Sequence, residues 1–436
     1  MVTLLGILVL IVGLLASVAI HELGHMVPAK RFGVRVSEYF VGFGPTLWSR
    51  VRGETEYGLK AIPLGGYVRL VGMIPPAEEV KPVRIGGAAG RLIADARDQS
   101  VLEVREGEEH RAFYRLSWWK KIIVMFGGPF TNLVLAAILF TIVLSGIGVP
   151  QQTLTVRELV PCVPPAGTVE CEPSDAPSPA VVAGLLPGDT IVSVDGVELG
   201  SWVELTSYVA ARPEQALRLV VDRADEHVAI ALTPAPRERI VTDDAGSPVL
   251  DAAGQPVTET VGFMGVFATS ERTRQPFLAG TRLTGQYLAA TLPVIATLPV
   301  QVWDIAAAAL TGQERDASGV MGIVGVGRAA GDIAAADVEG YGFVEKLADM
   351  LMLLGGLNLA LFAFNMIPLV PLDGGHIASA IWQGIKNGWA RLRKAGMPRP
   401  VDVARMMPLA YGVFAILIVM TVVLVYADIV APVRLT

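Results

Sequence analysis

The chain has 436 residues, of which 52% are hydrophobic and only 17% are charged, whereas a typical soluble domain has about 25% charged residues. This composition excludes a disordered chain, and a formal net charge of −6 gives no basic footprint for binding nucleic acid. Two cysteines exclude a disulfide-rich scaffold and a cysteine-rich metal cluster. We therefore predict a polytopic α-helical membrane protein with about four transmembrane helices.

Four apolar stretches reach the length of about 20 residues that a helix needs to cross a bilayer. They are Val2–Ile20, Ile122–Val149, Leu347–Leu372 and Met407–Val430. We expect the first to be a span and not a signal peptide, because it lacks a basic start and a small-residue cleavage site.

Two further segments are expected at the membrane surface. Residues 283–303 contain no charged side chain, but they include Pro293 and Pro299. We predict that they form an interfacial or re-entrant segment. Residues 378–396 combine apolar and basic positions, which predicts an interfacial helix on the cytoplasmic side. The apolar run 319–331 is short and rich in glycine.

The distribution of Lys and Arg predicts the orientation in the membrane. Residues 29–121 hold 16 of these cations and residues 377–406 hold 6, whereas residues 151–282 hold 9 in a longer segment. The first two segments are therefore predicted to be cytoplasmic, and both termini and 151–282 to be outside.

The region 150–270 is predicted to be an inserted α+β domain. The segments 153–160 and 189–199 alternate β-branched and polar residues, as strands do. Ser201 and Glu204 have the spacing of a helix capping box, and a hairpin turn is expected near 224–226. The repetitive stretch 241–260 indicates an exposed hairpin or loop.

The two cysteines, Cys162 and Cys171, flank the turn-forming residues Pro164 and Pro165. Both fall in the segment assigned outside, where disulfides form. We expect a disulfide, with two free thiols as the alternative.

The strongest chemical signal is the sequence HELGH at 21–25. On a helix, His21 and His25 share one face and both imidazoles can bind one Zn²⁺, with Glu22 beside the metal-bound water as a base. Ionisable groups at the end of an apolar span are costly unless they serve a function.

A catalytic zinc site needs a third protein ligand. Asp373 is the predicted ligand and lies in the segment NMIPLVPLDGGH at 365–376. It is expected at the inner end of the third span, and His25 is expected at the inner end of the first span, so the two can meet. The alternative role of Asp373 is a cap of the next helix. His376 is an alternative ligand, whereas His110 and His227 fall in soluble segments and are expected at the surface.

The sequence resembles the site-2 protease family of intramembrane zinc metalloproteases, most closely its bacterial RseP-type branch with one PDZ domain. HELGH matches the HExxH motif, NMIPLVPLDGG matches NxxPxPxLDG, and GPFTN at 128–132 matches GPxxN. The segments 37–44 and 56–68 resemble the segments that follow the family's first span. In the family the second of these forms a membrane re-entrant β-hairpin, and in this sequence it is predicted to form two short strands around a Pro-Leu-Gly-Gly turn. Residues 178–196 resemble a bacterial PDZ domain, although the insertion 162–171 departs from that pattern, so the PDZ groove stays unassigned.

The resemblance implies a domain order along the chain. We expect a first transmembrane helix with HExxH (1–30), a cytoplasmic segment with a re-entrant β-hairpin (31–121), a second transmembrane helix (122–149), an extracytoplasmic PDZ-like domain (150–270), an interfacial linker (271–343), a third transmembrane helix with LDG (344–376), a cytoplasmic interfacial helix (377–406) and a fourth transmembrane helix (407–430).

The expected activity is zinc-dependent cleavage of single-span membrane proteins, such as anti-sigma factors, in the bacterial cytoplasmic membrane. Zinc held by His21, His25 and Asp373 would act with Glu22, while Asn132 would orient or pack the second span. The predicted substrate-binding residues are Asn365, Gly65, Gly66 and Tyr67. The expected partners are these substrates and the lipid bilayer, with no nucleic acid. A non-proteolytic zinc sensor or transporter and an inactive PDZ scaffold are the alternatives.

Overall fold

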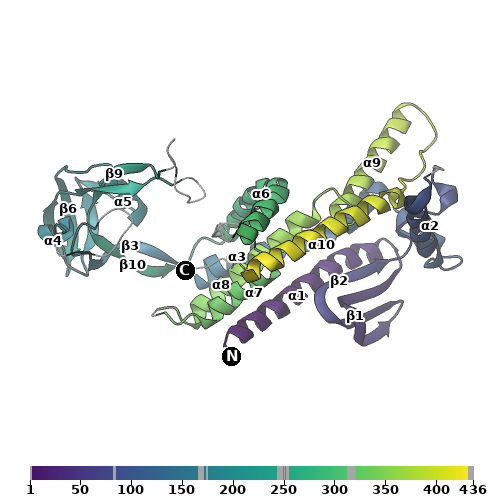
Figure 1. The fold of residues 1–436 in the computed structure, drawn as a ribbon, viewed down its shortest axis with the longest axis horizontal. Coiled ribbons are helices and arrows are strands. Elements are labelled where there is room, and N and C mark those ends of the chain that lie inside the picture. The colour runs from purple at the N-terminus through teal and green to yellow at the C-terminus, as the bar shows by residue number, and fades with distance from the viewer. Residues whose placement is uncertain are drawn as a thin grey trace. The chain divides into compact units, whose positions relative to one another are not determined.

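The computed structural model describes residues 2–81, 85–164, 171–172, 175–242, 249, 251, 255–311, 321–338 and 340–430. The chain divides into two compact units (Figure 1). The first unit contains Met1–Ile147 and Pro276–Thr436, and the second contains Gly148–Gln275.

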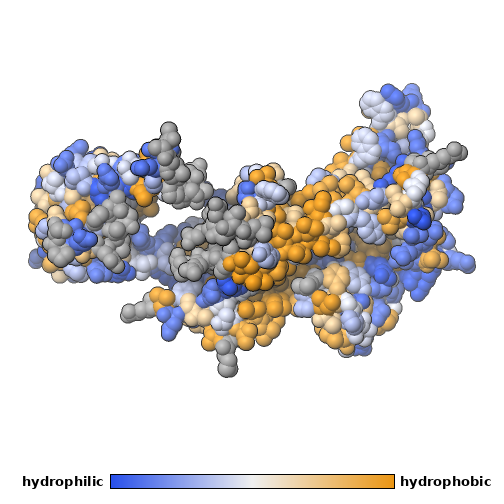
Figure 2. Space-filling model, viewed as in Figure 1, coloured by the Kyte–Doolittle hydropathy of each residue, from blue (hydrophilic) through white to orange (hydrophobic). Residues whose placement is uncertain are grey.

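The first unit is mainly helical. Its helices are α1 (Val2–Arg31), η1 (Ala77–Glu79), α2 (Gly87–Leu102), η2 (Glu109–Arg111), η3 (Phe113–Arg115), α3 (Trp118–Thr141), the π-helical η4 (Ile142–Ile147), α6 (Ala279–Thr311), α7 (Ile323–Ala335), α8 (Phe343–Asn365), α9 (Asp373–Leu392), η5 (Val403–Met406) and α10 (Met407–Val430). Hydrophobic residues cover α10 and the helices beside it, whereas hydrophilic residues dominate around α2 (Figure 2).

Four helical stretches among the described residues are long and apolar enough to cross a membrane: Val2–Arg31, Trp118–Ile147, Phe343–Asn365 and Val403–Val430. They confirm a multi-pass helical membrane protein with about four spans.

The ends of the middle spans differ from the sequence prediction. The second helical stretch ends at Ile147, and Val149 already begins a strand. The third ends at Asn365 and not at Leu372, because the following segment contains Pro368 and Pro371, which have no N–H group to continue a helix. The helix predicted over 378–396 begins earlier, so that the LDGG sequence contributes its first turn.

The predicted surface segment 283–303 lies within α6. This helix bends by 67° between Leu298 and Val300, where Pro299 interrupts the backbone hydrogen bonds. The bend fits a broken or re-entrant segment, and whether it crosses the membrane stays a prediction. Helix α7, with 13 residues, is about 20 Å long and too short to cross.

The strands β1 (Val36–Arg52) and β2 (Thr55–Leu70) form an antiparallel pair. Although β2 is one continuous assignment, its two halves pair with β1 separately, because residues 56–59 and 66–69 both pair with residues 38–41. The chain therefore reverses direction at Pro-Leu-Gly-Gly between two short strand segments, as predicted, and a further turn at Gly53–Glu54 joins β1 to β2. Within this turn Gly65 has a φ of 102°, a conformation that glycine adopts without strain.

The second unit is an α+β domain. A sheet with the order β10-β3-β4-β6-β7 carries β5 beside β4, and β8 pairs separately with β9. The elements are β3 (Val149–Leu159), α4 (Pro179–Ala183), β4 (Thr190–Val194), β5 (Val197–Glu198), α5 (Trp202–Ala210), β6 (Leu217–Arg223), β7 (Glu226–Leu232), β8 (Ala235–Ile240), β9 (Thr258–Phe263) and β10 (Val266–Thr273).

Local signals in this unit were predicted correctly. The Oγ atom of Ser201 accepts the N–H of Glu204 at 3.2 Å, and the Glu204 carboxylate accepts the N–H of Gly200 at 2.8 Å, so α5 has the expected cap. Strands β6 and β7 turn at Ala224 and Asp225, both with positive φ. Half of the repetitive stretch 241–260 falls outside the described residues, and its end, from Thr258, belongs to β9.

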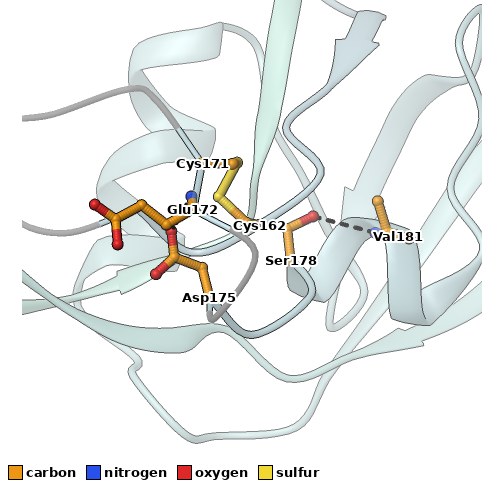
Figure 3. Close-up of a disulfide and its surroundings, with 6 residues drawn as sticks. All are labelled: Cys162, Cys171, Glu172, Asp175, Ser178 and Val181. Carbon is orange, nitrogen blue, oxygen red and sulfur yellow. Dashed lines mark hydrogen bonds between the residues drawn. A yellow bond between two sulfur atoms is a disulfide. The ribbon is translucent and has the colours of Figure 1, made fainter.

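A disulfide joins Cys162 to Cys171 in this unit (Figure 3). The expected pairing is therefore confirmed. Beyond the bridge, the N–H of Glu172 donates to the carboxylate of Asp175, and Ser178 caps α4 by accepting the N–H of Val181. The bridge joins the two ends of the inserted segment 162–171 to each other, and residues 165–170 lie outside the described residues.

Candidate metal centre

Helix α1 brings two imidazoles and a carboxylate to one place. His21 and His25 are four residues apart and lie on one face of the helix, with Glu22 in the same turn. The Nε2 atoms of the two histidines are 3.2 Å apart. His25 is only 5% exposed, so this polar pair lies in the packed interior of the helical unit.

Asp373 completes the cluster from a distant part of the chain. Its Oδ2 atom lies 3.4 Å from Nε2 of His21 and 3.4 Å from Nε2 of His25. The N-cap of α9 is Leu372, so the carboxylate of Asp373 is directed at the histidines and does not cap the helix.

Two glycines after Asp373 allow this approach. A Cβ atom on Gly374 would lie less than 3.0 Å from the carbonyl oxygens of Met366 and Ile367, and one on Gly375 would lie equally close to the backbone of Leu369 and Val370. The first turn of α9 therefore packs directly on the break that follows α8. This backbone contact explains the sequence Asp-Gly-Gly in structural terms.

The donor atoms fit a zinc ion. Tetrahedral Zn²⁺ with bonds of 2.0–2.1 Å separates any two ligand atoms by about 3.3 Å. The three distances among the His21, His25 and Asp373 donors, 3.2, 3.4 and 3.4 Å, agree with that spacing. Two imidazoles and a carboxylate are also a usual ligand set for catalytic zinc.

A hydrogen bond fixes the ring of His25. Its Nδ1–H donates to the carbonyl oxygen of Val124 at 2.8 Å, which leaves Nε2 unprotonated and free to bind a metal. His21 differs, because its Nδ1 atom is buried and has no hydrogen-bond partner among the described residues.

Glycines of α3 let this helix pack against the histidines. Gly24 of α1 and Gly127 of α3 meet backbone to backbone, since a Cβ on either would lie less than 3.0 Å from the other's carbonyl oxygen. A Cβ on Gly128 would lie equally close to the imidazole of His25. This role was not predicted from the sequence, although the pair Gly127-Gly128 inside an apolar span is a visible signal.

Strand β2 passes beside Glu22. A Cβ on Gly66 would lie 2.9 Å from Cγ1 of Val18 and 3.4 Å from Cγ of Glu22. The hydroxyl of Tyr39, in β1, donates to the carbonyl oxygen of Ala19 at 2.7 Å and ties the sheet to α1. The structure thus brings one of the predicted substrate-binding residues next to the predicted base.

Tyr67 belongs to an aromatic cluster of the β1–β2 pair. Its ring stacks on Phe40 and Phe43, with centroids 5.7 and 6.2 Å apart, and its hydroxyl donates to Glu38 at 2.7 Å. Its predicted contact with substrate stays a prediction.

The remaining candidates occupy different places. Asn365 is the last residue of α8 and is half-buried, and Asn132 of α3 is 1% exposed. His376 lies three residues along α9 from Asp373. His110 and His227 lie on η2 and β7 and are exposed, as expected.

Comparison with known proteins identifies the family. The model of peptidase family M50 matches residues 9–409, which is most of the chain. The chain belongs to peptidase family M50. The predicted membership of the site-2 proteases is therefore confirmed.

Curated M50 relatives cover nearly the whole chain. The zinc metalloprotease Rip1 of Mycobacterium tuberculosis is 32% identical over 99% of this chain and 98% of its own length. The metalloprotease MmpA of Caulobacter vibrioides is 27% identical over 87% and 88% of the two chains, and the zinc metalloprotease RasP of Oceanobacillus iheyensis is 26% identical over 92% and 95%. This M50 protein is a zinc metalloprotease.

Proposed function

We propose that this M50 protein hydrolyses peptide bonds within the membrane at a zinc ion held by His21, His25 and Asp373, with Glu22 as the base. The observation that carries the proposal is the convergence of three donor atoms within 4.8 Å of one another at an apolar helix. Glu22 is adjacent in sequence to one ligand and is not itself among the converging atoms.

The chemistry follows from the residue types. Zn²⁺, when bound, supplies a Lewis acid that polarises the scissile carbonyl and makes the attacking water more acidic. The Glu22 carboxylate accepts a proton from that water and later passes it to the leaving amine. His21, His25 and Asp373 hold the centre in place.

The substrate must reach Glu22 in an extended form, because the amides and carbonyls of a helix are already hydrogen-bonded to each other. In the register of the sheet, the segment of β2 from Gly66 to Leu70 pairs with the segment of β1 from Val36 to Val41. We propose that substrate adds as a strand beside Gly65, Gly66 and Tyr67. Asn365, at the end of α8, would hydrogen-bond the extended backbone.

The proposed substrates are single-span membrane proteins, with anti-sigma factors as the class that the family resemblance implies. A helix of that kind enters sideways from lipid, which suits a site built on apolar spans. We propose that the α+β unit, Gly148–Gln275, is PDZ-like and lies outside the bacterial cytoplasmic membrane, where it filters or docks substrates that a first protease has shortened. The zinc site would lie near the cytoplasmic side, and β1–β2 would associate with the membrane.

The ligand assignment is tested by single replacements in the purified full-length protein. His21→Ala, His25→Ala and Asp373→Ala are each expected to abolish cleavage of a single-span substrate, and the two histidine variants to lose bound zinc as well, because a site with two protein ligands is incomplete. His110→Ala and His227→Ala are matched controls, since both histidines are exposed and remote in sequence from the motifs. Zinc content by mass spectrometry together with cleavage decides the matter, and active, zinc-loaded His25→Ala protein would contradict the assignment.

The orientation is tested by cysteine labelling in a C162S/C171S background. Gln215 and Gly388 are both exposed and lie in segments of opposite predicted sidedness. A cysteine at 215 should react with a membrane-impermeant maleimide in intact cells, and one at 388 only after the membrane is opened. Reaction of both positions in intact cells would mean that α6 crosses the membrane and that the proposed orientation is wrong.

A further inference from the structure

Helices α1 and α3 run antiparallel in a definite register around the histidines. Gly24 contacts Gly127, and the hydroxyl of Thr131 lies 3.3 Å from the carbonyl oxygen of Ile20. Along the same register, a Cβ atom added to Gly128 would lie less than 3.0 Å from the imidazole ring of His25.

One helical turn further, this register pairs two other residues. His21 precedes His25 by four positions in α1, and Asn132 follows Gly128 by four positions in α3. Residues four apart lie on the same helix face. The register therefore places Asn132 on the face of α3 that is turned toward His21, as Gly128 is on the face turned toward His25.

Both members of this pair have unsatisfied polar atoms. Asn132 is 1% exposed, and within the described part of the chain neither its amide oxygen nor its amide nitrogen has a hydrogen-bond partner. Nδ1 of His21 is likewise buried and unpartnered there, whereas Nδ1 of His25 donates to Val124. Buried polar groups without partners are costly in a protein interior, and they are rare unless they serve a function.

A histidine that binds a metal through one ring nitrogen normally donates the other N–H to an oxygen acceptor, which fixes its tautomer and orientation. His25 has such an acceptor, whereas His21 has none among the described residues. The amide oxygen of Asn132 is an acceptor of the required kind on the facing helix.

We propose that Asn132 is the positioning residue of His21, and that its amide oxygen accepts the Nδ1–H of His21 through one water molecule. The role rests on the proposed function of His21 as a zinc ligand. The hydrogen bond keeps Nε2 of His21 unprotonated and directed at the metal. Asn132 itself touches neither the metal nor the substrate.

The experiment measures zinc affinity, by competition with a chromogenic chelator, for full-length protein in detergent. Asn132→Leu preserves the size of the side chain but removes the acceptor, and it should weaken zinc binding by about 10- to 100-fold. Asn132→Asp keeps an acceptor oxygen and should bind zinc at least as tightly as the wild type. Tight zinc binding by Asn132→Asp but not by Asn132→Leu would show that residue 132 acts as a hydrogen-bond acceptor and does not merely fill space.

Asn358→Leu is the matched control for loss of a buried amide. Asn358 is also fully buried, and its amide donates to Ser17 at 3.0 Å, one turn before His21 in α1. This variant should lower the melting temperature of the zinc-free protein but leave zinc affinity within about twofold of wild type, because it removes packing and not a partner of the ligand.

The outcomes separate this inference from the proposed function. Zinc affinity of Asn132→Leu equal to wild type, or equally weak binding by Asn132→Asp and Asn132→Leu, would overturn the role of Asn132. His21→Ala is measured in parallel. If that variant keeps full zinc affinity, the assignment of the ligand itself fails, and if it alone loses zinc, only the inference about Asn132 fails.

Discussion

Replacing Glu22 by glutamine is expected to abolish cleavage while the protein keeps its zinc. Glutamine has nearly the same size as glutamate but cannot accept a proton from water, and a positioned general base typically contributes about 10²- to 10⁴-fold to a rate. The metal should remain, because the converging donor atoms belong to His21, His25 and Asp373. The measurement is the rate of cleavage of a single-span substrate, with zinc content determined on the same preparation.

Glu198→Gln is the control for this replacement, since Glu198 is an exposed residue of β5 in the other unit. It should cleave at the wild-type rate. Cleavage by Glu22→Gln within about tenfold of wild type would refute the role of Glu22 as the base, and loss of zinc would instead make Glu22 a ligand.

The features that were predictable from sequence are those in which neighbours along the chain decide the structure. The spacing of His21 and His25 fixes one helix face, and the pair Ser201 and Glu204 fixes the start of α5, with no contribution from distant residues. The limits of α10 follow from its apolar run alone. The three motifs also sufficed to predict the family and the identity of the metal.

The features that were not predictable depend on contacts between distant segments. The carbonyl oxygen that orients His25 belongs to Val124, 99 residues away. The two halves of β2 both pair with residues 38–41 of β1, and Gly66 packs against Val18 and Glu22 of α1, which the local sequence does not reveal. The role of Gly128 has the same origin, because only the facing helix shows why a side chain is excluded there.

Because a side chain is excluded at this position, we expect a large loss of activity in the variant Gly128→Ala. A Cβ atom at this position would lie less than 3.0 Å from three atoms of the His25 imidazole, a ring that the bond to Val124 holds in place. Either the ring turns away from the metal position or the two helices separate, and misplacement of a catalytic group by about 1 Å can cost 10²-fold in rate. We expect cleavage to fall by at least about 10²-fold, with clearly weaker zinc binding.

Gly356→Ala provides the comparison, since it makes the same change within the apolar helix α8, where an added Cβ would meet no atom of the described residues within 4 Å. It should keep wild-type activity and zinc affinity, because alanine favours a helix more than glycine does. The thermal stability of both zinc-free variants should be measured as well, since forcing a methyl group into a packed site costs about 1–3 kcal/mol. Wild-type cleavage by Gly128→Ala would mean that α3 is not packed against His25 in the active enzyme.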